Sequence, residues 1–170
     1  MRILVADDHA VVRSGLKAIL GGRPGWEICA EATTGSETVA LARQFRPDVA
    51  IVDLNMPGLS GLEAIHRIKK SVPTVEVVVL TCHYSKTLLR TILDSGAVGF
   101  VLKSDADRDL ITAVEAASHR QFFISRQADG GVTTSSVTDP FAAALAEREA
   151  LTSGERSQVR LISKRLRQIL

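Results

Sequence analysis

Short runs of apolar residues recur along the first two thirds of the chain, and each is followed by a longer amphipathic segment. The apolar runs occupy residues 2–6, 27–31, 49–52, 75–80 and 98–102. Several consist almost wholly of Val, Ile, Leu and Ala, which is typical of strands buried on both faces of a parallel sheet. The pattern therefore predicts strands separated by connecting segments long enough to cross over the sheet.

The connecting segments carry apolar residues at the three- and four-residue spacing of a helix with one buried face. These residues are Val12, Leu16, Ile19, Leu20, Val39, Ala42, Phe45, Leu62, Ile65, Ile68, Leu88, Leu89, Ile92, Leu110, Ile111, Val114 and Ala117. Pro47 and Pro73 each end a helical pattern shortly before the next apolar run. The alternation predicts an α/β fold over residues 1–120, with a doubly wound, five-stranded parallel sheet.

The remainder of the chain changes in character. Residues 129–140 are rich in Gly, Ser and Thr, so we expect a flexible linker over 121–140. Beyond it, 141–150 is rich in Ala, Leu and Glu, and apolar residues from Val159 onward recur with helical spacing. We therefore expect a helical tail over 141–170, in which Thr152 and Glu155 have the spacing of a capping box.

Composition identifies the class of protein but not its partner. With 170 residues, 45% of them apolar and 24% charged, the chain can form a folded core. The apolar runs are too short to span a membrane, and acids at positions 7 and 8 interrupt any secretion signal. Two isolated cysteines fit a reducing compartment, so we expect a cytoplasmic protein with no membrane partner.

Charge is distributed unevenly between the two parts of the chain. Residues 1–118 carry 13 basic and 14 acidic side chains, whereas 119–170 carry 8 basic and 5 acidic ones, a net charge of +3. A basic tail is compatible with a nucleic-acid partner, but it is more often the solvated face of a helix. Charge alone does not decide between these two readings.

Polar side chains follow four of the predicted strands at the point where each strand ends. Asp7 and Asp8 follow the first strand, Asp53 the third, Thr81 the fourth and Lys103 the fifth. Because ligands of open parallel sheets bind beyond the carboxyl ends of the strands, these side chains are expected to converge at one edge. Taken singly, each is more simply explained as a helix cap, a loop residue or a solvated charge. It is their combination at separate strand ends that favours a binding site.

Three carboxylates held together favour a hard divalent cation with oxygen ligands. A lysine in the same place can neutralise an anion, and a threonine hydroxyl can donate a hydrogen bond to it. Such a group of residues suits the transfer of a phosphoryl group to a carboxylate, in which positioning and charge neutralisation matter most.

Four segments around these residues resemble the receiver domain of bacterial response regulators, which has a flavodoxin-like fold. The segments are 3–9, 52–61, 79–81 and 95–103. The resemblance covers residues 1 to about 120. It implies that Asp53 accepts a phosphoryl group from a histidine kinase. It also implies that Asp7, Asp8, Asp53 and the backbone carbonyl of Asn55 bind Mg²⁺.

The resemblance further implies a conformational switch. Thr81 would donate a hydrogen bond to the phosphoryl oxygen, Lys103 would form an ion pair with it, and the movement of Thr81 would free space for Phe100. Receivers commonly form a homodimer after this change. Phe100 is equally well explained as a core aromatic residue. His9 is read as the start of the first helix, and His83 as a solvated residue near the phosphoryl group.

Residues 8–9 and 12–16 resemble regulators of the NarL/FixJ type, which carry a LuxR-type helix-turn-helix domain. Residues 151–156 resemble the opening of that domain, and 159–163 resemble its first helix. The resemblance ends there, and a helix-turn-helix needs a second helix in the major groove. We therefore expect an incomplete output domain within this sequence, with DNA as a partner only where a complete one exists.

Two alternatives to a transcriptional regulator follow from the same residues. One is a receiver that signals by protein–protein contact, with the basic tail docking on a partner. The other is a metal-dependent phosphohydrolase in which Asp53 is a transient nucleophile. Asn55 argues against the second, because haloacid-dehalogenase-type enzymes carry Asp-x-Asp at this point and after their first strand. We therefore expect no enzyme activity beyond self-phosphorylation and slow self-dephosphorylation.

Overall fold

A computed structural model describes residues 1–125, and the expected helical tail and most of the expected linker lie outside them. The strands are β1 (Arg2–Ala6), β2 (Glu27–Ala32), β3 (Val49–Asp53), β4 (Glu76–Thr81), β5 (Gly99–Leu102) and β6 (Phe123–Ile124). The helices are α1 (Ala10–Gly21), α2 (Gly35–Phe45), α3 (Gly61–Ser71), α4 (Lys86–Ser95) and α5 (Ala106–Ser118), with a short 3₁₀ turn, η1 (Lys103–Asp105), before α5. Within residues 1–125, no helix is both long and apolar enough to cross a membrane.

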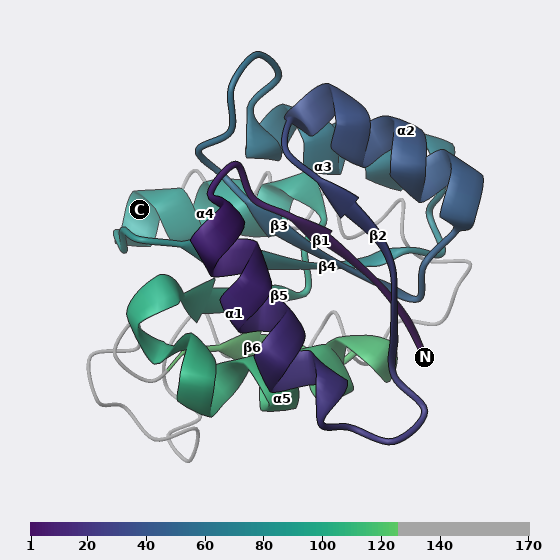
Figure 1. Ribbon diagram of the computed structural model, residues 1–170. Helices are drawn as coiled ribbons and strands as arrows, with labels where there is room; N and C mark the ends of the chain where they lie inside the picture. Colours follow the sequence, from purple (N-terminus) through teal and green to yellow (C-terminus); the bar gives the residue numbers. More distant parts are fainter. Residues whose placement is uncertain (126–170) are drawn as a thin grey trace. The chain divides into compact units, whose positions relative to one another are not determined.

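The strands form one parallel sheet in the order β2-β1-β3-β4-β5-β6 (Figure 1). This confirms the predicted α/β fold, and the first five strands lie within one or two residues of the predicted runs. The sixth strand was not predicted. It lies in the segment expected to be linker, and a strand of two residues is too short to show an alternating pattern.

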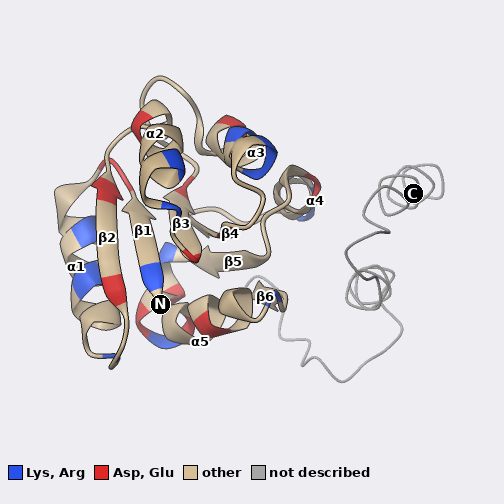
Figure 2. Cartoon of the chain, turned by 90° about the vertical axis from the view of Figure 1, so that its right-hand side faces the viewer, with Lys and Arg blue, Asp and Glu red and all other residues tan. Residues whose placement is uncertain are grey.

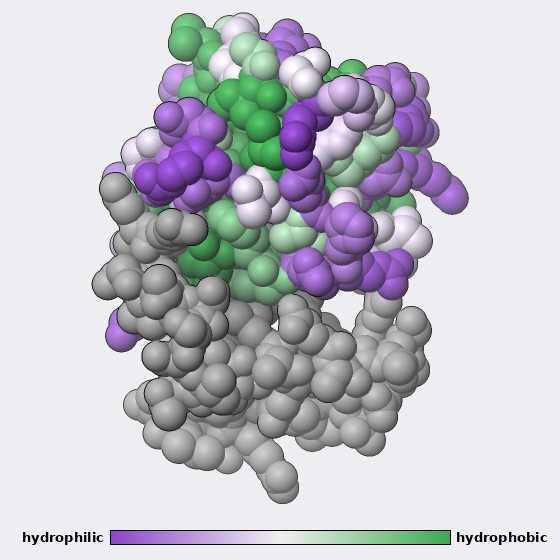
Figure 3. Space-filling view, turned by 90° about the horizontal axis from the view of Figure 1, so that it is seen from below, coloured by the Kyte–Doolittle hydropathy of each residue, from purple (hydrophilic) through white to green (hydrophobic). Residues whose placement is uncertain are grey.

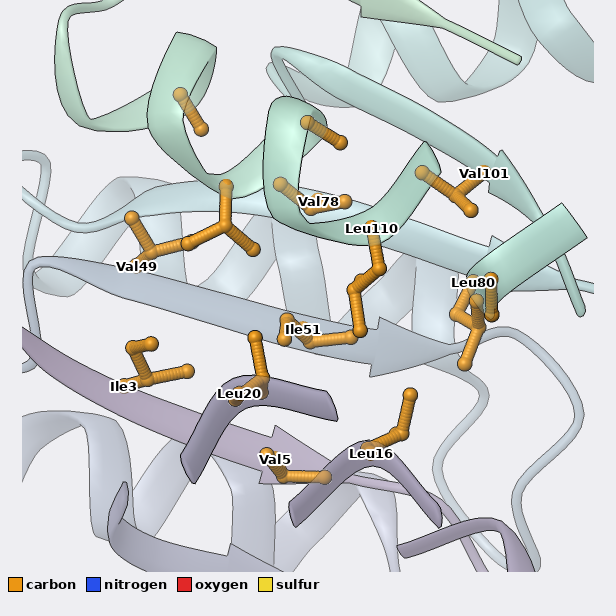
Figure 4. Close-up of a cluster of buried hydrophobic side chains, with 14 of the residues drawn as sticks. Ile3, Val5, Leu16, Leu20, Val49, Ile51, Val78, Leu80, Val101 and Leu110 are labelled. Atoms are coloured by element: carbon orange, nitrogen blue, oxygen red, sulfur yellow. The ribbon is translucent and has the colours of Figure 1, made fainter. Parts of the chain in front are cut away.

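Helices cover both faces of the sheet (Figure 1), with α1 and α5 on one face and α2, α3 and α4 on the other. Alternate residues of the central strands point toward α1 and α5 and pack there against Leu16, Leu20 and Leu110 (Figure 4). The residues of β3 and β4 are buried throughout, which explains the apolar runs 49–52 and 77–80 within them. Figure 2 shows charged residues mainly on the helices and toward the strand ends.

A buried polar cluster holds the end of the described chain. Ser125, which directly follows β6, is fully buried, and its hydroxyl donates to Oδ2 of Asp109 at 2.5 Å and to Oδ2 of Asp105 at 3.3 Å. Arg108 pairs with the other oxygen of each aspartate. The backbone N–H of Ser125 also donates to the carbonyl of Phe100 at 2.9 Å. The cluster therefore ties the chain leaving the sheet to η1 and α5.

Helix α3 begins against the backbone of β3. A Cβ atom on Gly61 would lie 2.1 Å from the carbonyl oxygen of Asp53 and 2.7 Å from Cα of Leu54. Ser60 caps the helix, its hydroxyl accepting a hydrogen bond from the N–H of Glu63. Only glycine permits this approach, so Gly61 sets the distance between α3 and the strand end that carries Asp53.

We predict that Gly61→Ala lowers the free energy of unfolding by about 1–3 kcal/mol, because the added methyl group displaces the backbone of β3. Gly15→Ala is the matched control, since nothing lies within 4 Å of a Cβ at this exposed position in α1. It should raise stability by about 1 kcal/mol through better helix propensity. Urea denaturation followed by circular dichroism measures both values. Equal effects of the two substitutions would contradict the close contact at Gly61.

We also predict that Ser125→Ala lowers the free energy of unfolding by about 1–3 kcal/mol, because Asp105 and Asp109 lose a buried donor. Ser118→Ala provides the control. The Ser118 hydroxyl donates to the carbonyl of Glu115 at an exposed position, and its loss should change stability by less than about 0.5 kcal/mol. Thermal or urea denaturation of the three proteins compares them directly. A Ser125→Ala protein as stable as wild type would show that this anchor contributes nothing to folding.

Candidate phospho-acceptor site

Strand register brings the predicted site residues to one edge of the sheet. Ala6 pairs with Val52, so Asp7 and Asp53 are the next residues of two adjacent strands. Asp53 in turn pairs with Leu80, one residue before Thr81. On the far side of β4, Thr81 pairs with Leu102, one residue before Lys103. Adjacent strands lie about 4.8 Å apart, so this register places Asp7 beside Asp53. Lys103 follows β5, which is separated from β3 by β4, and its long side chain spans that gap to reach both aspartates.

Lys103 joins the two buried aspartates. Its Nζ lies 2.7 Å from Oδ2 of Asp53 and 2.7 Å from Oδ2 of Asp7. Asp7 and Asp53 are 0% and 1% exposed, so their charges have little access to water. Burial by itself would lower the pKa of Lys103, but the hydrogen bonds and ion pairs that its ammonium makes to Asp53 and Asp7 outweigh this effect and raise that pKa above its ordinary value. Lys103 is therefore a permanent cation at neutral pH.

Each aspartate also accepts a backbone hydrogen bond. The N–H of His9 donates to Oδ1 of Asp7 at 2.8 Å, and the N–H of Asn55 donates to Oδ1 of Asp53 at 3.2 Å. Oδ2 of Asp7 is fully buried and accepts no hydrogen bond of normal geometry, although Lys103 is close to it. Oδ2 of Asp7 is thus a buried carboxylate oxygen that is paired with a cation but has room for a further partner.

Asp8 and His9 complete the group at the mouth of the site. One oxygen of each of Asp7, Asp8 and Asp53 and a ring nitrogen of His9 all lie within 4.8 Å of one another. Nδ1 of His9 is 2.7 Å from Oδ1 of Asp8 and 3.3 Å from Oδ1 of Asp7. His9 is the N-cap residue of α1, as expected from the sequence. The proximity of its ring to the carboxylates was missed, although its position directly after two aspartates was the available signal.

Thr81 lies at the same sheet edge, but its hydroxyl is used locally. It accepts a hydrogen bond from the N–H of His83 at 3.2 Å and lies 3.5 Å from the carbonyl of the same residue. Phe100 is fully buried, with its ring edge-on to Tyr84 at a centroid distance of 6.0 Å. The switch movements of Thr81 and Phe100, and the ligand role of the Asn55 carbonyl, stay predictions.

A groove lies beside Lys103, between α1 and the start of α5. It has a volume of about 340 Å³ and is lined mainly by small and apolar residues: Val12, Gly15, Leu16, Ile19, Leu80, Lys103, Ser104, Ala106 and Asp107. Val11, which directly precedes Val12 in the first turn of α1, is 85% exposed. Figure 3, which views the protein from below, shows hydrophobic side chains reaching the surface between hydrophilic areas.

The response regulator receiver domain family matches residues 3–115, which include the sheet edge and every charged residue of the site. The chain belongs to this family. The match confirms the resemblance inferred from the sequence segments around the aspartates and the lysine.

Curated relatives include the oxygen regulatory protein NreC of Staphylococcus epidermidis, which is 39% identical over 140 residues. That alignment covers 82% of this chain and 62% of NreC. The response regulator UvrY of Escherichia coli is 31% identical over 154 residues, which cover 88% of this chain and 70% of UvrY. The chain thus spans less than two thirds of the length of NreC.

Solved structures give the same result. A two-component response regulator of the LuxR family from Aurantimonas sp. SI85-9A1 has a TM-score of 0.73 and 31% identity, covering 76% of this chain and 93% of that one. The receiver domain of the putative response regulator NarL from Mycobacterium tuberculosis has a TM-score of 0.66 and 27% identity. The match covers 69% of this chain and 95% of that receiver domain. The receiver is therefore of the NarL/LuxR type found in two-component signalling and transcription regulation.

We predict that Lys103→Met lowers the free energy of unfolding by about 3–5 kcal/mol, because Asp7 and Asp53 lose their shared buried counter-charge. Lys70→Met, at an exposed position of α3, should change it by less than about 0.5 kcal/mol. The double variant Lys103→Met/Asp53→Asn should regain part of the lost free energy of unfolding, because one unpaired buried carboxylate is removed. Urea denaturation in metal-free buffer measures all four proteins. A Lys103→Met protein as stable as wild type would show that the two carboxylates do not depend on this cation.

Proposed function

We propose that this receiver is the phospho-acceptor of a two-component system, and that Asp53 receives the phosphoryl group. The observation that carries the proposal is the pairing of a buried Asp53 carboxylate with Lys103, 2.7 Å away, beside two further aspartates. A carboxylate in this position can act as a nucleophile, and the adjacent cation can neutralise the anion that reaches it.

The donor set fits Mg²⁺. Carboxylate oxygens are the ligands that this ion prefers, and Oδ2 of Asp7 is buried with the Lys103 ammonium beside it but no hydrogen bond of normal geometry. With Lys103 protonated, the three aspartates and the lysine carry a net charge of −2, which a divalent cation balances. Asp7, Asp8 and Asp53, with the carbonyl of Asn55, would hold the ion. When bound, Mg²⁺ neutralises charge on the phosphoryl oxygens.

The reaction at Asp53 follows from the chemistry of the donor. A histidine kinase presents a phosphohistidine, the P–N bond breaks, and a new P–O bond forms to a carboxylate oxygen of Asp53. Lys103 pairs with the transferred group, and the Thr81 hydroxyl turns from His83 to donate a hydrogen bond to it. Asp53 is consumed once per phosphoryl group, so the protein is a stoichiometric acceptor rather than an enzyme that turns over substrate.

The partners follow from the same surface. The groove between α1 and α5 opens beside Lys103 and presents apolar residues of α1, which suits a helix of the kinase that approaches Asp53. We expect phosphorylation to promote a homodimer, and we expect the protein to act in the cytoplasm. Control of transcription through DNA requires a complete output domain. Signalling by protein–protein contact is the alternative.

We predict that acetyl phosphate with Mg²⁺ phosphorylates the wild-type chain to at most one phosphoryl group per molecule, and that Asp53→Ala abolishes this. Intact mass spectrometry measures the added mass, and removing Mg²⁺ with a chelator should prevent it. Asp94→Ala, an exposed position in α4, is the matched acidic control and should be phosphorylated as wild type. Equal phosphorylation of wild type and Asp53→Ala would contradict the proposal, and release of many equivalents of phosphate would favour a phosphohydrolase.

A further inference from the structure

We propose that His9 contributes an imidazole nitrogen to the metal site, so that the site binds divalent transition ions such as Ni²⁺ and Co²⁺ far more tightly than Mg²⁺. The inference rests on the metal site of the proposed function and adds a ligand to it. Its basis is the position of the His9 ring among the carboxylates of Asp7, Asp8 and Asp53.

The distances allow one ion to reach all four side chains. Nδ1 of His9 is in direct contact with an oxygen of Asp8 at 2.7 Å and lies 3.3 Å from an oxygen of Asp7, close to the separation of about 3 Å between neighbouring ligands of one ion. Ligand atoms about 2.1 Å from an ion can lie up to about 4.2 Å apart. The four donor atoms lie within 4.8 Å of one another, so only a small side-chain rotation is needed to bring them to one centre.

The backbone fixes His9, while its ring contacts the carboxylates of Asp7 and Asp8 and is otherwise open to solvent. Its N–H donates to Oδ1 of Asp7 at 2.8 Å, and its carbonyl accepts the N–H of Arg13 at 3.1 Å in the first turn of α1. The side chain makes no capping hydrogen bond and is 66% exposed. The ring can therefore rotate toward an ion without disturbing packed neighbours, whereas Asp7 and Asp53 are held by the sheet.

The chemistry of the added ligand determines which ions benefit. Mg²⁺ takes oxygen ligands and retains several waters, so a neutral imidazole adds little to its affinity. Imidazole is a good ligand for the later first-row ions, whose affinity for mixed nitrogen and oxygen sites rises from Mn²⁺ through Co²⁺ to Ni²⁺. The three aspartates and Lys103 together carry a net charge of −2, which a divalent ion neutralises. A neutral imidazole can therefore join the ligands without leaving an unbalanced charge in the site.

The test compares metal binding by the wild-type chain and His9→Ala, both without a histidine tag. Isothermal titration with NiCl₂ and separately with MgCl₂, at one slightly alkaline pH, gives the two dissociation constants. We expect His9→Ala to weaken Ni²⁺ binding at least about tenfold and Mg²⁺ binding less than about twofold. His66→Ala, which removes an exposed histidine of α3, is the matched control and should bind both ions as wild type does.

Two outcomes would overturn the inference: Ni²⁺ binding that His9→Ala leaves unchanged, or Ni²⁺ and Mg²⁺ binding weakened by the same factor. Circular dichroism of His9→Ala confirms that the variant is folded, so a loss of Ni²⁺ binding reports on the ligand. The visible spectrum of bound Co²⁺ gives a second readout, because loss of a nitrogen ligand shifts its absorption. These titrations do not test the proposed function, which fails only if acetyl phosphate does not phosphorylate Asp53 in the wild-type chain.

Discussion

Two carboxylates share one ammonium group at the carboxyl ends of the strands, and the arrangement of this sheet edge depends on that interaction. Asp7 and Asp53 are almost wholly removed from water and carry like charges on adjacent strands. Lys103 lies 2.7 Å from an oxygen of each, and single backbone N–H groups hold the opposite oxygens. One cation between two buried anions leaves negative charge uncompensated, so the folded protein holds a site with an intrinsic attraction for a further cation.

The groups around this centre differ in how firmly they are held. Asp7 and Asp53 lie at the ends of paired strands. The close approach of Gly61 to the Asp53 carbonyl also fixes the backbone of Asp53 against the start of α3. Lys103 instead begins the single turn η1, whose last residue, Asp105, is tied to Ser125 at the point where the chain leaves the sheet. A displacement of Lys103 therefore acts on a short turn that is directly linked to the segment following the receiver.

Sequence periodicity was sufficient for the central sheet and for the convergence of the acidic residues with Lys103. The carboxyl ends of parallel strands share one edge of the sheet, so Asp7, Asp53 and Lys103 were expected at that edge once their strands were recognised. The long Lys103 side chain then reaches both aspartates across β4. The direction of the Thr81 hydroxyl was not predictable, because it depends on a side-chain rotamer and a local loop. The His9 ring depends on a rotamer in the same way. The anchor at Ser125 was missed because two strand residues carry no periodicity, and its partners Asp105 and Asp109 look like ordinary polar residues of a helix start.

On the proposed function, phosphorylation of Asp53 would change the charge balance of the site and demand a response from the groups around it. An acyl phosphate carries more negative charge than the carboxylate it replaces, so it demands additional donors. Lys103 is already in place, and the next hydroxyl along the sheet edge is that of Thr81, which contacts the backbone of His83. On the proposed function, turning that hydroxyl toward Asp53 would rearrange its contacts with the backbone of His83, in the loop whose Tyr84 packs on Phe100 and which leads into α4. On the proposed function, the donor that would complete the phosphorylated site is thus a group that contacts this loop, which couples the conformation of the loop to the state of Asp53.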